Sequence, residues 1–264
     1  MSNNETKNKT ENENTHTYDN GFHPKEVILK ENYKFYRKGF FFKIANYLTK
    51  LITAFFVFFP KKLCWGFKVV GRKNKKHIDS SILLCNHTIP YDIFLILTSM
   101  KYKKLYITTL QSNMGFGIVS TYFRLGGAVP IPTDMNMLIK FNKQTYDAIN
   151  NKSSVIFYPE AALIPFCDHI RNFMPGAFHY AYATTKKIIP MVITYHKPKG
   201  LYKLTRRKKP CIHLNILEPY YMDDILRKRE AIEKARLDVE KIMSDYFISH
   251  SDYYYDKNGN KLEK

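Results

Sequence analysis

A histidine followed five residues later by an aspartate is the part of this chain best suited to chemistry. His87 and Asp92 both lie in the stretch CNHTIPYD, residues 85–92. A histidine held by a carboxylate serves as a general base near neutral pH, because the carboxylate fixes the imidazole tautomer and stabilises the imidazolium that forms. An ordinary capped turn is the alternative, in which Asn86 and Thr88 cap the turn, Asp92 complements the dipole of the following helix and His87 is an incidental loop histidine.

The elements around this stretch predict where its side chains lie. The apolar run 81–84 reads as a buried strand, and Pro90 reads as the first residue of a helix, so His87 follows a strand and Asp92 falls in a first helical turn. A second predicted strand, 154–158, ends in Pro159 and Glu160. In a parallel sheet the two strand ends share the edge at which open α/β sheets bind ligands.

Other chemistries fit these residues less well. A nucleophile pair of Cys85 and His87 is disfavoured because Cys85 continues an apolar run and should face the core. The chain has no Gly-x-Ser-x-Gly elbow. Metal binding by His87, Asp92 and Glu160 lacks a second histidine at ligand spacing. We therefore expect a substrate hydroxyl to attack directly, with no metal and no covalent enzyme intermediate.

Strands alternate with helices along the chain, which predicts an α/β fold with a mainly parallel sheet flanked by helices. The predicted strands cover 67–70, 81–84, 105–110, 154–158, 187–195 and 212–217, and residues 128–132 are predicted to be a short extended piece because each proline favours the β region in the residue before it. Helices are predicted up to Leu125, from Asp134 to about Asn150, and from about Gly176. A last helix, capped by Asp223, should face the core through Ile225, Ile232, Ala235, Val239, Ile242 and Tyr246.

Composition indicates the partners. The chain has 42 Lys and Arg against 23 Asp and Glu, a formal net charge of +19, which favours a membrane surface, a nucleic acid or an acidic carrier protein. Its four cysteines show no metal or disulfide spacing and indicate buried thiols in a reducing compartment. Residues 1–20 are polar and predict a disordered tail without a secretory signal, and residues 249–264 predict a polar, frayed tail.

One strongly apolar segment covers residues 38–60. Its polar residues Lys43, Asn46, Lys50 and Thr53 follow i, i+3, i+7, i+10 spacing, which gives one narrow polar stripe on an otherwise apolar and aromatic helix. We predict an interfacial helix that lies in a membrane surface. A helix packed on the domain core and a spanning helix are the alternatives. The basic run 197–209 is either a solvated loop or a further contact for anionic headgroups.

The ordered motifs resemble the glycerolipid acyltransferases, especially the bacterial 1-acyl-sn-glycerol-3-phosphate acyltransferases. The family's Asn-His-x4-Asp signature, the HX4D motif, matches Asn86, His87 and Asp92. Its Gly-x-x-x-Ile-x-Arg block resembles 127–133, and its Phe-Pro-Glu-Gly-Thr-Arg block resembles 158–163. The stretches 173–178 and 189–191 also resemble later family blocks, so the likeness covers about residues 65–220.

The resemblance implies how the protein would act. His87 would deprotonate an acceptor hydroxyl, Asp92 would orient His87, and the hydroxyl would attack a thioester of acyl carrier protein or coenzyme A, with no cofactor. Glu160 would help to place the acceptor, and Asn86, Gly127 and Pro159 belong to the same blocks. The implied organisation is a membrane-associating segment at 21–64 and an acyltransferase domain at 65–248, on the cytoplasmic face of a membrane.

Two departures from the family pattern concern the acceptor. Family arginines that are taken to bind its phosphate are Thr133 and Leu163 here. Because a phosphate needs cations or amide donors, either Arg171, Arg124 or His169 substitutes, or the acceptor lacks that phosphate.

We therefore predict a phospholipid-biosynthetic enzyme that acylates 1-acyl-glycerol-3-phosphate. Another lysophospholipid, neutral or zwitterionic, or a glycan is the alternative acceptor. A non-catalytic basic membrane- or nucleic-acid-binding protein would have no need for a base at His87 paired to Asp92, and no nucleic-acid module appears.

Overall fold

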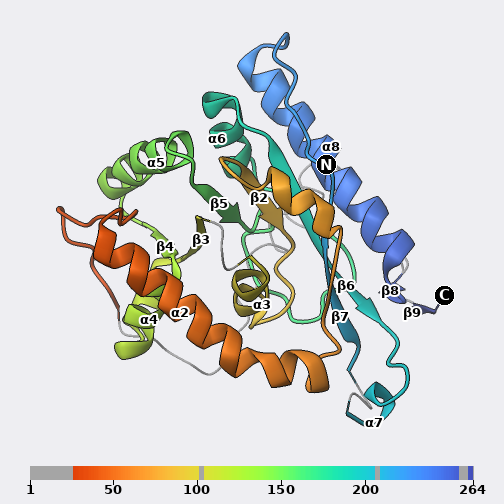
Figure 1. The fold of residues 1–264 in the computed structure, drawn as a ribbon. Helices are drawn as coiled ribbons and strands as arrows, with labels where there is room; N and C mark the ends of the chain where they lie inside the picture. Colours follow the sequence, from red (N-terminus) through yellow and green to blue (C-terminus); the bar gives the residue numbers. More distant parts are fainter. Residues whose placement is uncertain (1–25, 101–103, 206–208, 256–260, 264) are drawn as a thin grey trace, which may run out of the picture.

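The protein folds around one seven-stranded sheet (Figure 1). The structure is a computed structural model that describes residues 26–100, 104–205, 209–255 and 261–263, so the predicted tail at 1–20 lies outside the described residues. The strand order is β1-β7-β6-β2-β5-β3-β4. The strands are β1 Lys68–Val70, β2 Ile82–Cys85, β3 Leu105–Leu110, β4 Ala128–Ile131, β5 Ser154–Phe157, β6 Ile188–His196 and β7 Cys211–Ile216.

Strand direction determines which chain segments meet. Strands β2, β3, β4, β5 and β6 are parallel to one another, whereas β7 pairs antiparallel with β6 and β1 pairs parallel with β7. The ends of β2, β5 and β6 therefore lie at one edge of the sheet, together with the start of β1. This mainly parallel α/β architecture confirms the predicted fold class.

Helices cover both faces of the sheet (Figure 1). One group contains α5 Met135–Asn150, α6 Gly176–Thr184 and α8 Lys228–His250, and the other contains α2 Phe40–Phe59, α3 Asp92–Ser99 and α4 Ile118–Gly126. Short helical turns at Pro60–Cys64 (η1), Arg72–His77 (η2) and Gln111–Gly115 (η3) and the short helix α7 Tyr202–Thr205 complete the main body. As predicted, Asp134 caps α5, and its side chain accepts a hydrogen bond from Met137 N–H.

Helix α2 is amphipathic in the reverse sense from a helix that packs on a core. Its buried residues are Thr49, Lys50 and Thr53, which belong to or adjoin the predicted polar stripe. Asn46, from the same stripe, donates a hydrogen bond to the carbonyl of Leu125 (2.6 Å). The polar stripe therefore packs on the protein from Asn46 to Thr53, whereas Lys43 at its start is exposed, and the apolar faces of α2 point outward.

The segment after β7 differs from the prediction. The last helix begins at Lys228 rather than at Asp223, and Ile225 lies outside it with 91% exposure. Asp223 accepts a hydrogen bond from the N–H of Ile225, a local turn that competes with helix initiation. Ile242 is 40% exposed, so it does not face the core as predicted. After α8 the chain continues into strands β8 Tyr253–Tyr255 and β9 Lys261–Glu263, which pair antiparallel where we predicted a frayed tail.

Candidate active site

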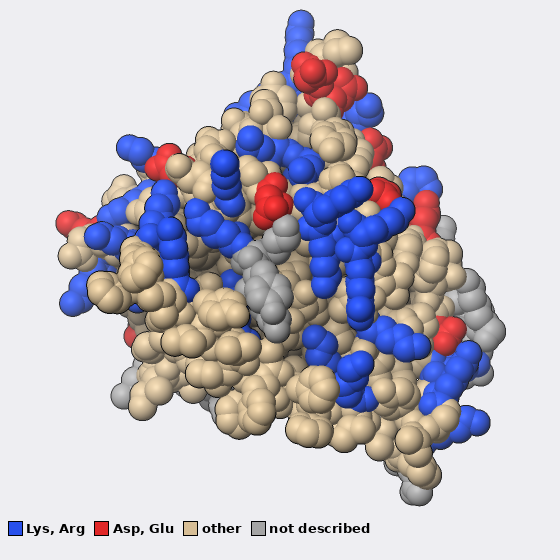
Figure 2. Space-filling model, in the orientation of Figure 1, with Lys and Arg blue, Asp and Glu red and all other residues tan. Residues whose placement is uncertain are grey.

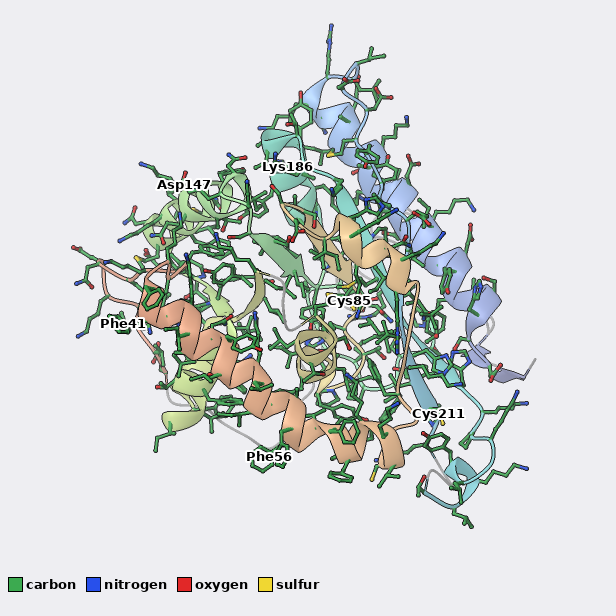
Figure 3. The ribbon with its side chains drawn as sticks, in the orientation of Figure 1. Phe41, Phe56, Cys85, Asp147, Lys186 and Cys211 are labelled. Atoms are coloured by element: carbon green, nitrogen blue, oxygen red, sulfur yellow. The ribbon has the colours of Figure 1, made fainter. Side chains whose placement is uncertain are left out.

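His87 and Asp92 meet at the edge of the sheet, directly after β2. The Nδ1 atom of His87 lies 2.7 Å from Oδ2 of Asp92, and because a carboxylate can only accept, Nδ1–H is the donor. The Asp92 side chain is 1% exposed, whereas that of His87 is 25% exposed. The second ring nitrogen, Nε2, is therefore the one available to a substrate hydroxyl, as a general base requires. Figure 3 labels Cys85, the last residue of β2, near the middle of the molecule.

Tyr158, the residue after β5, completes this pair. Its hydroxyl donates to the other carboxylate oxygen of Asp92, Oδ1, over 2.9 Å. Its ring stacks on the imidazole of His87 with centroids 4.1 Å apart. Burial, together with the charge of Asp92, raises the pKa of Tyr158 well above its usual value, so the phenol stays protonated as a donor. This role of Tyr158 was not predicted from the sequence, although a tyrosine at a position where the family has phenylalanine was a signal for it.

Glu160 lies at the same edge, after β5, but its charge is engaged within the protein. Its carboxylate accepts a hydrogen bond from Arg171 Nη2 over 2.8 Å, and both side chains are almost fully buried. The backbone N–H of His87 also points to Glu160 Oε2, at 3.4 Å. Burial raises the pKa of Glu160, and the Arg171 guanidinium opposes that rise. The ion pair therefore ties the 161–171 loop to the backbone of residues 86–92, the candidate catalytic turn.

Asn86 and Thr88 hold the turn on either side of His87. The Asn86 side-chain amide exchanges two hydrogen bonds with the backbone of Ile193 in β6, at 2.8 and 3.2 Å. The hydroxyl of Thr88 bonds to that of Tyr195, and its backbone carbonyl accepts from Phe166 N–H. Both residues are 1% exposed, so they fix the backbone that presents His87.

Two predicted site residues lie at the opposite edge of the sheet. Gly127 precedes β4 and ends α4 with φ +103°, and a Cβ there would lie 2.8 Å from the carbonyl oxygen of Leu105. The guanidinium of Arg124 is buried and donates to the backbone carbonyls of Lys34, Phe35 and Ala128. These contacts give Gly127 and Arg124 a structural role, at the end of the sheet opposite to His87.

The remaining predicted residues border the edge of the sheet at which β2, β5 and β6 end, which we call the candidate catalytic edge or, for short, the catalytic edge. Thr133 follows β4, is exposed, and its N–H donates to the Gln111 side chain. The carbonyl of Pro159 accepts from Met174 N–H. Leu163 is half-buried, and the backbone N–H of the next residue, Ile164, donates to the carbonyl of His87. The side chains at positions 133 and 163, Thr133 and Leu163, are uncharged and cannot replace the family arginines.

A group of three successive residues on this loop could offer metal ligands. Ligand atoms of Cys167, Asp168 and His169 all lie within 4.8 Å of one another. The three side chains already interact, because His169 Nδ1 lies 2.7 Å from the Asp168 carboxylate and 3.8 Å from Cys167 Sγ. The thiol and the carboxylate raise the pKa of His169 to about 9, against the opposing effect of burial. In its charged form His169 donates a hydrogen bond through Nδ1 to the Asp168 carboxylate.

Comparison with known proteins agrees with this geometry. Residues 66–194 match the family model described as Acyltransferase. The region holds His87, Asp92, Tyr158 and Glu160, so the chain carries an acyltransferase domain and the protein is an acyltransferase.

A solved structure has the same fold. It is the 1-acyl-sn-glycerophosphate acyltransferase PlsC from Thermotoga maritima, with a TM-score of 0.51 and 17% sequence identity, over 79% of this chain and 98% of that chain. A search of curated proteins finds no match to the sequence.

Proposed function

We propose that this acyltransferase transfers a fatty acyl group from a thioester of acyl carrier protein or coenzyme A to the hydroxyl of a lysophospholipid, with 1-acyl-glycerol-3-phosphate as the acceptor, in phospholipid biosynthesis. The observation that carries the proposal is the Nδ1–Oδ2 contact of 2.7 Å between His87 and Asp92 at the end of a central strand. The fold shared with PlsC, whose name states this acceptor, supports the choice of substrate.

In the proposed reaction, Nε2 of His87 takes the proton from the acceptor hydroxyl as its oxygen attacks the thioester carbonyl carbon. The carbon–sulfur bond breaks as the tetrahedral intermediate collapses to the ester. The thiolate that leaves receives the proton from the imidazolium. Asp92 stabilises that imidazolium through Nδ1–H, and Tyr158 holds the second oxygen of Asp92 so that the carboxylate cannot rotate away.

We also propose that the enzyme works at the cytoplasmic face of a membrane, as a monotopic protein. Phe40–Cys64 is the one described helix long and apolar enough to cross a membrane by length and composition, which alone is weak support. Its outward residues include Phe40, Phe41, Phe55 and Phe56, each 70% exposed or more. Its polar stripe packs on the protein, which favours a helix lying along the membrane surface rather than across it.

A neutral or zwitterionic lysophospholipid is the second candidate acceptor. The Arg171 guanidinium is paired with Glu160, and that of Arg124 is bound to backbone carbonyls at the far edge. Of the three substitutes named for the missing arginines, only His169 is exposed near the catalytic turn. An acceptor without a terminal phosphate would need no such clamp.

An acceptor panel tests the proposal. Purified enzyme in detergent is given one acyl thioester and, separately, 1-acyl-glycerol-3-phosphate, lysophosphatidylcholine and lysophosphatidylethanolamine, and the diacyl product is measured. The proposal predicts the highest kcat/KM for 1-acyl-glycerol-3-phosphate. Acylation of a zwitterionic acceptor alone would establish the second candidate, and acylation of none of them would contradict both.

A further inference from the structure

The segment that joins β6 to β7 emerges at the same edge of the sheet as His87. Cys85 at the end of β2 pairs with Met191, and the parallel strand β6 continues past that level to His196. The chain then forms α7, Tyr202–Thr205, before it returns in β7. In Figure 1, α7 lies beside the C-terminal end of the α2 and η1 helical segment.

Tyr202 fastens α7 to that helical segment. Its hydroxyl donates to the backbone carbonyl of Lys62 in η1 over 2.5 Å. A Cβ at Gly66, just after η1, would lie 3.5 Å from the Tyr202 ring and 2.4 Å from Cys211 Sγ, which shows how closely the chain passes here. Trp65, from the same turn, stacks on Tyr91 of the catalytic turn with centroids 4.4 Å apart. The end of α2, α7 and the catalytic turn therefore form one connected region.

The residues on either side of Tyr202 face solvent. Leu201 is 79% exposed and Leu204 is 67% exposed, so neither contributes to the core. On the neighbouring η1 segment, Leu63 is 57% exposed, and Phe59 at the end of α2 is 61% exposed. The apolar face of α2 thus continues onto α7. Figure 2 shows an area without Lys, Arg, Asp or Glu at the lower left of the molecule, where α2 runs, and Lys and Arg side chains at the lower right.

We propose that Leu201 and Leu204 insert into an anionic phospholipid surface as a second membrane contact, separate from α2. A helix lying in a membrane can still roll about its own axis, whereas a second contact away from that axis fixes the orientation. With α2 and α7 both engaged, the edge that carries His87 faces the lipid that holds the acceptor. This inference rests on the proposed membrane-associated function.

Charge favours an anionic bilayer as the occupant. Exposed Lys199, Lys203 and Lys209 flank the two leucines, and exposed Lys62 lies on η1. Each basic residue near an anionic surface adds to the electrostatic attraction between the protein and that surface. An apolar pair ringed by lysines is the composition of an interfacial anchor.

The test uses the full-length protein with Leu201→Ser and Leu204→Ser combined, and Ile225→Ser as the matched control. Ile225 is even more exposed than the two leucines, at 91%, and it lies in the segment before α8. The two helices α7 and α8 lie apart in Figure 1. Co-flotation is measured with vesicles of phosphatidylcholine alone and of phosphatidylcholine with phosphatidylglycerol. Acyl transfer is measured with a long-chain lysolipid in those vesicles and with a short-chain acceptor free in solution.

The double variant is expected to bind anionic vesicles about tenfold more weakly. It should acylate the vesicle-bound acceptor more slowly and the soluble acceptor at the wild-type rate, while Ile225→Ser changes neither. Unchanged vesicle binding would overturn the inference. The double variant could instead keep its vesicle binding but lose activity with an acyl carrier protein thioester and not with a coenzyme A thioester. That result would also overturn the inference and would assign α7 to binding of the carrier protein. Failure of the wild-type enzyme to acylate any lysophospholipid would count against the proposed function, whereas the flotation result still decides the α7 contact.

Discussion

Two regions of this molecule place charged and apolar side chains contrary to the usual distribution, and they do so in opposite ways. The catalytic edge buries Asp92, Glu160 and Arg171, and their charges pair with groups of the same chain. Helix α2 exposes a row of phenylalanines that nothing in the described protein covers. The charges buried at the catalytic edge therefore have partners within the chain, although Nε and Nη1 of Arg171 have no hydrogen-bond partner among the described residues. The outward apolar face of α2, in contrast, has no partner in the described protein. Monomeric soluble proteins rarely leave so large an apolar surface uncovered.

The largest effect is expected where the catalytic edge loses a charge. Glu160→Gln leaves the buried Arg171 guanidinium without its carboxylate, so the free energy of unfolding should fall by about 3–5 kcal/mol. Asp245→Asn, which breaks the exposed pair with Lys241, serves as the control and should change it by less than about 0.5 kcal/mol. Urea unfolding followed by fluorescence measures both. Equal effects of the two variants would mean that the buried ion pair of Glu160 and Arg171 does not stabilise the fold.

For α2 the expected change is in membrane binding rather than stability. Full burial of a phenylalanine contributes about 1.5–3 kcal/mol, so Phe55→Ser combined with Phe56→Ser should weaken vesicle binding by more than about tenfold. Both residues are 70% exposed or more, and folding stability should therefore hardly change. Leu237→Ser, on the outer side of α8, is the matched control and should leave vesicle binding as it is. Vesicle binding that survives the double substitution would contradict the role of α2.

The buried stripe of α2 should reveal itself through pH. Burial lowers the pKa of Lys50 to about 8, below its usual 10.5. Between pH 8 and 10.5 Lys50 is neutral in the folded protein but still protonated in the unfolded chain. The free energy of unfolding of the wild type should therefore rise with pH relative to that of Lys50→Met. We expect a relative gain of about 1–2 kcal/mol, measured by urea unfolding at pH 7 and pH 10. Lys43→Met, at an exposed position of the same helix, should show no such trend.

The smallest effect concerns Tyr158. Tyr158→Phe restores the family residue, keeps the ring stacked on His87 and removes only the hydrogen bond to Asp92. We expect kcat to fall about two- to tenfold with KM nearly unchanged, because one buried hydrogen bond contributes about 0.5–1.5 kcal/mol. The pH profile of kcat should shift as well, since Asp92 then interacts with His87 alone. A variant with the wild-type pH profile and rate would remove Tyr158 from the account.

Local pattern predicted much of this structure. Apolar runs predicted six strands of the main sheet, and the prolines of 128–132 predicted an extended piece where β4 lies. The parallel ordering brought Glu160 beside His87 because β2 and β5 are neighbours. The polar stripe of α2 was readable from its spacing. Which side of α2 faces the protein was not, because the answer depends on what the other elements leave uncovered.

Contacts between residues far apart in the sequence could not be predicted from the sequence. Nothing near Asn86 predicts that its amide bonds to Ile193, more than a hundred residues away. Likewise the candidate phosphate ligand Arg171 is engaged by Glu160, which only the path of the 161–171 loop determines. The helix start at Asp223 failed for a local reason, since an aspartate that caps a helix can equally close a turn.

The central claim is that His87 is the general base of acyl transfer, and its most direct test is the initial rate of the His87→Ala variant on lysolipid-containing vesicles. A general base contributes roughly 10²–10⁴-fold to rate, so the account predicts a loss of that size, with folding and vesicle binding equal to wild type. A rate within about tenfold of wild type, from a variant that folds and binds normally, would contradict the mechanism.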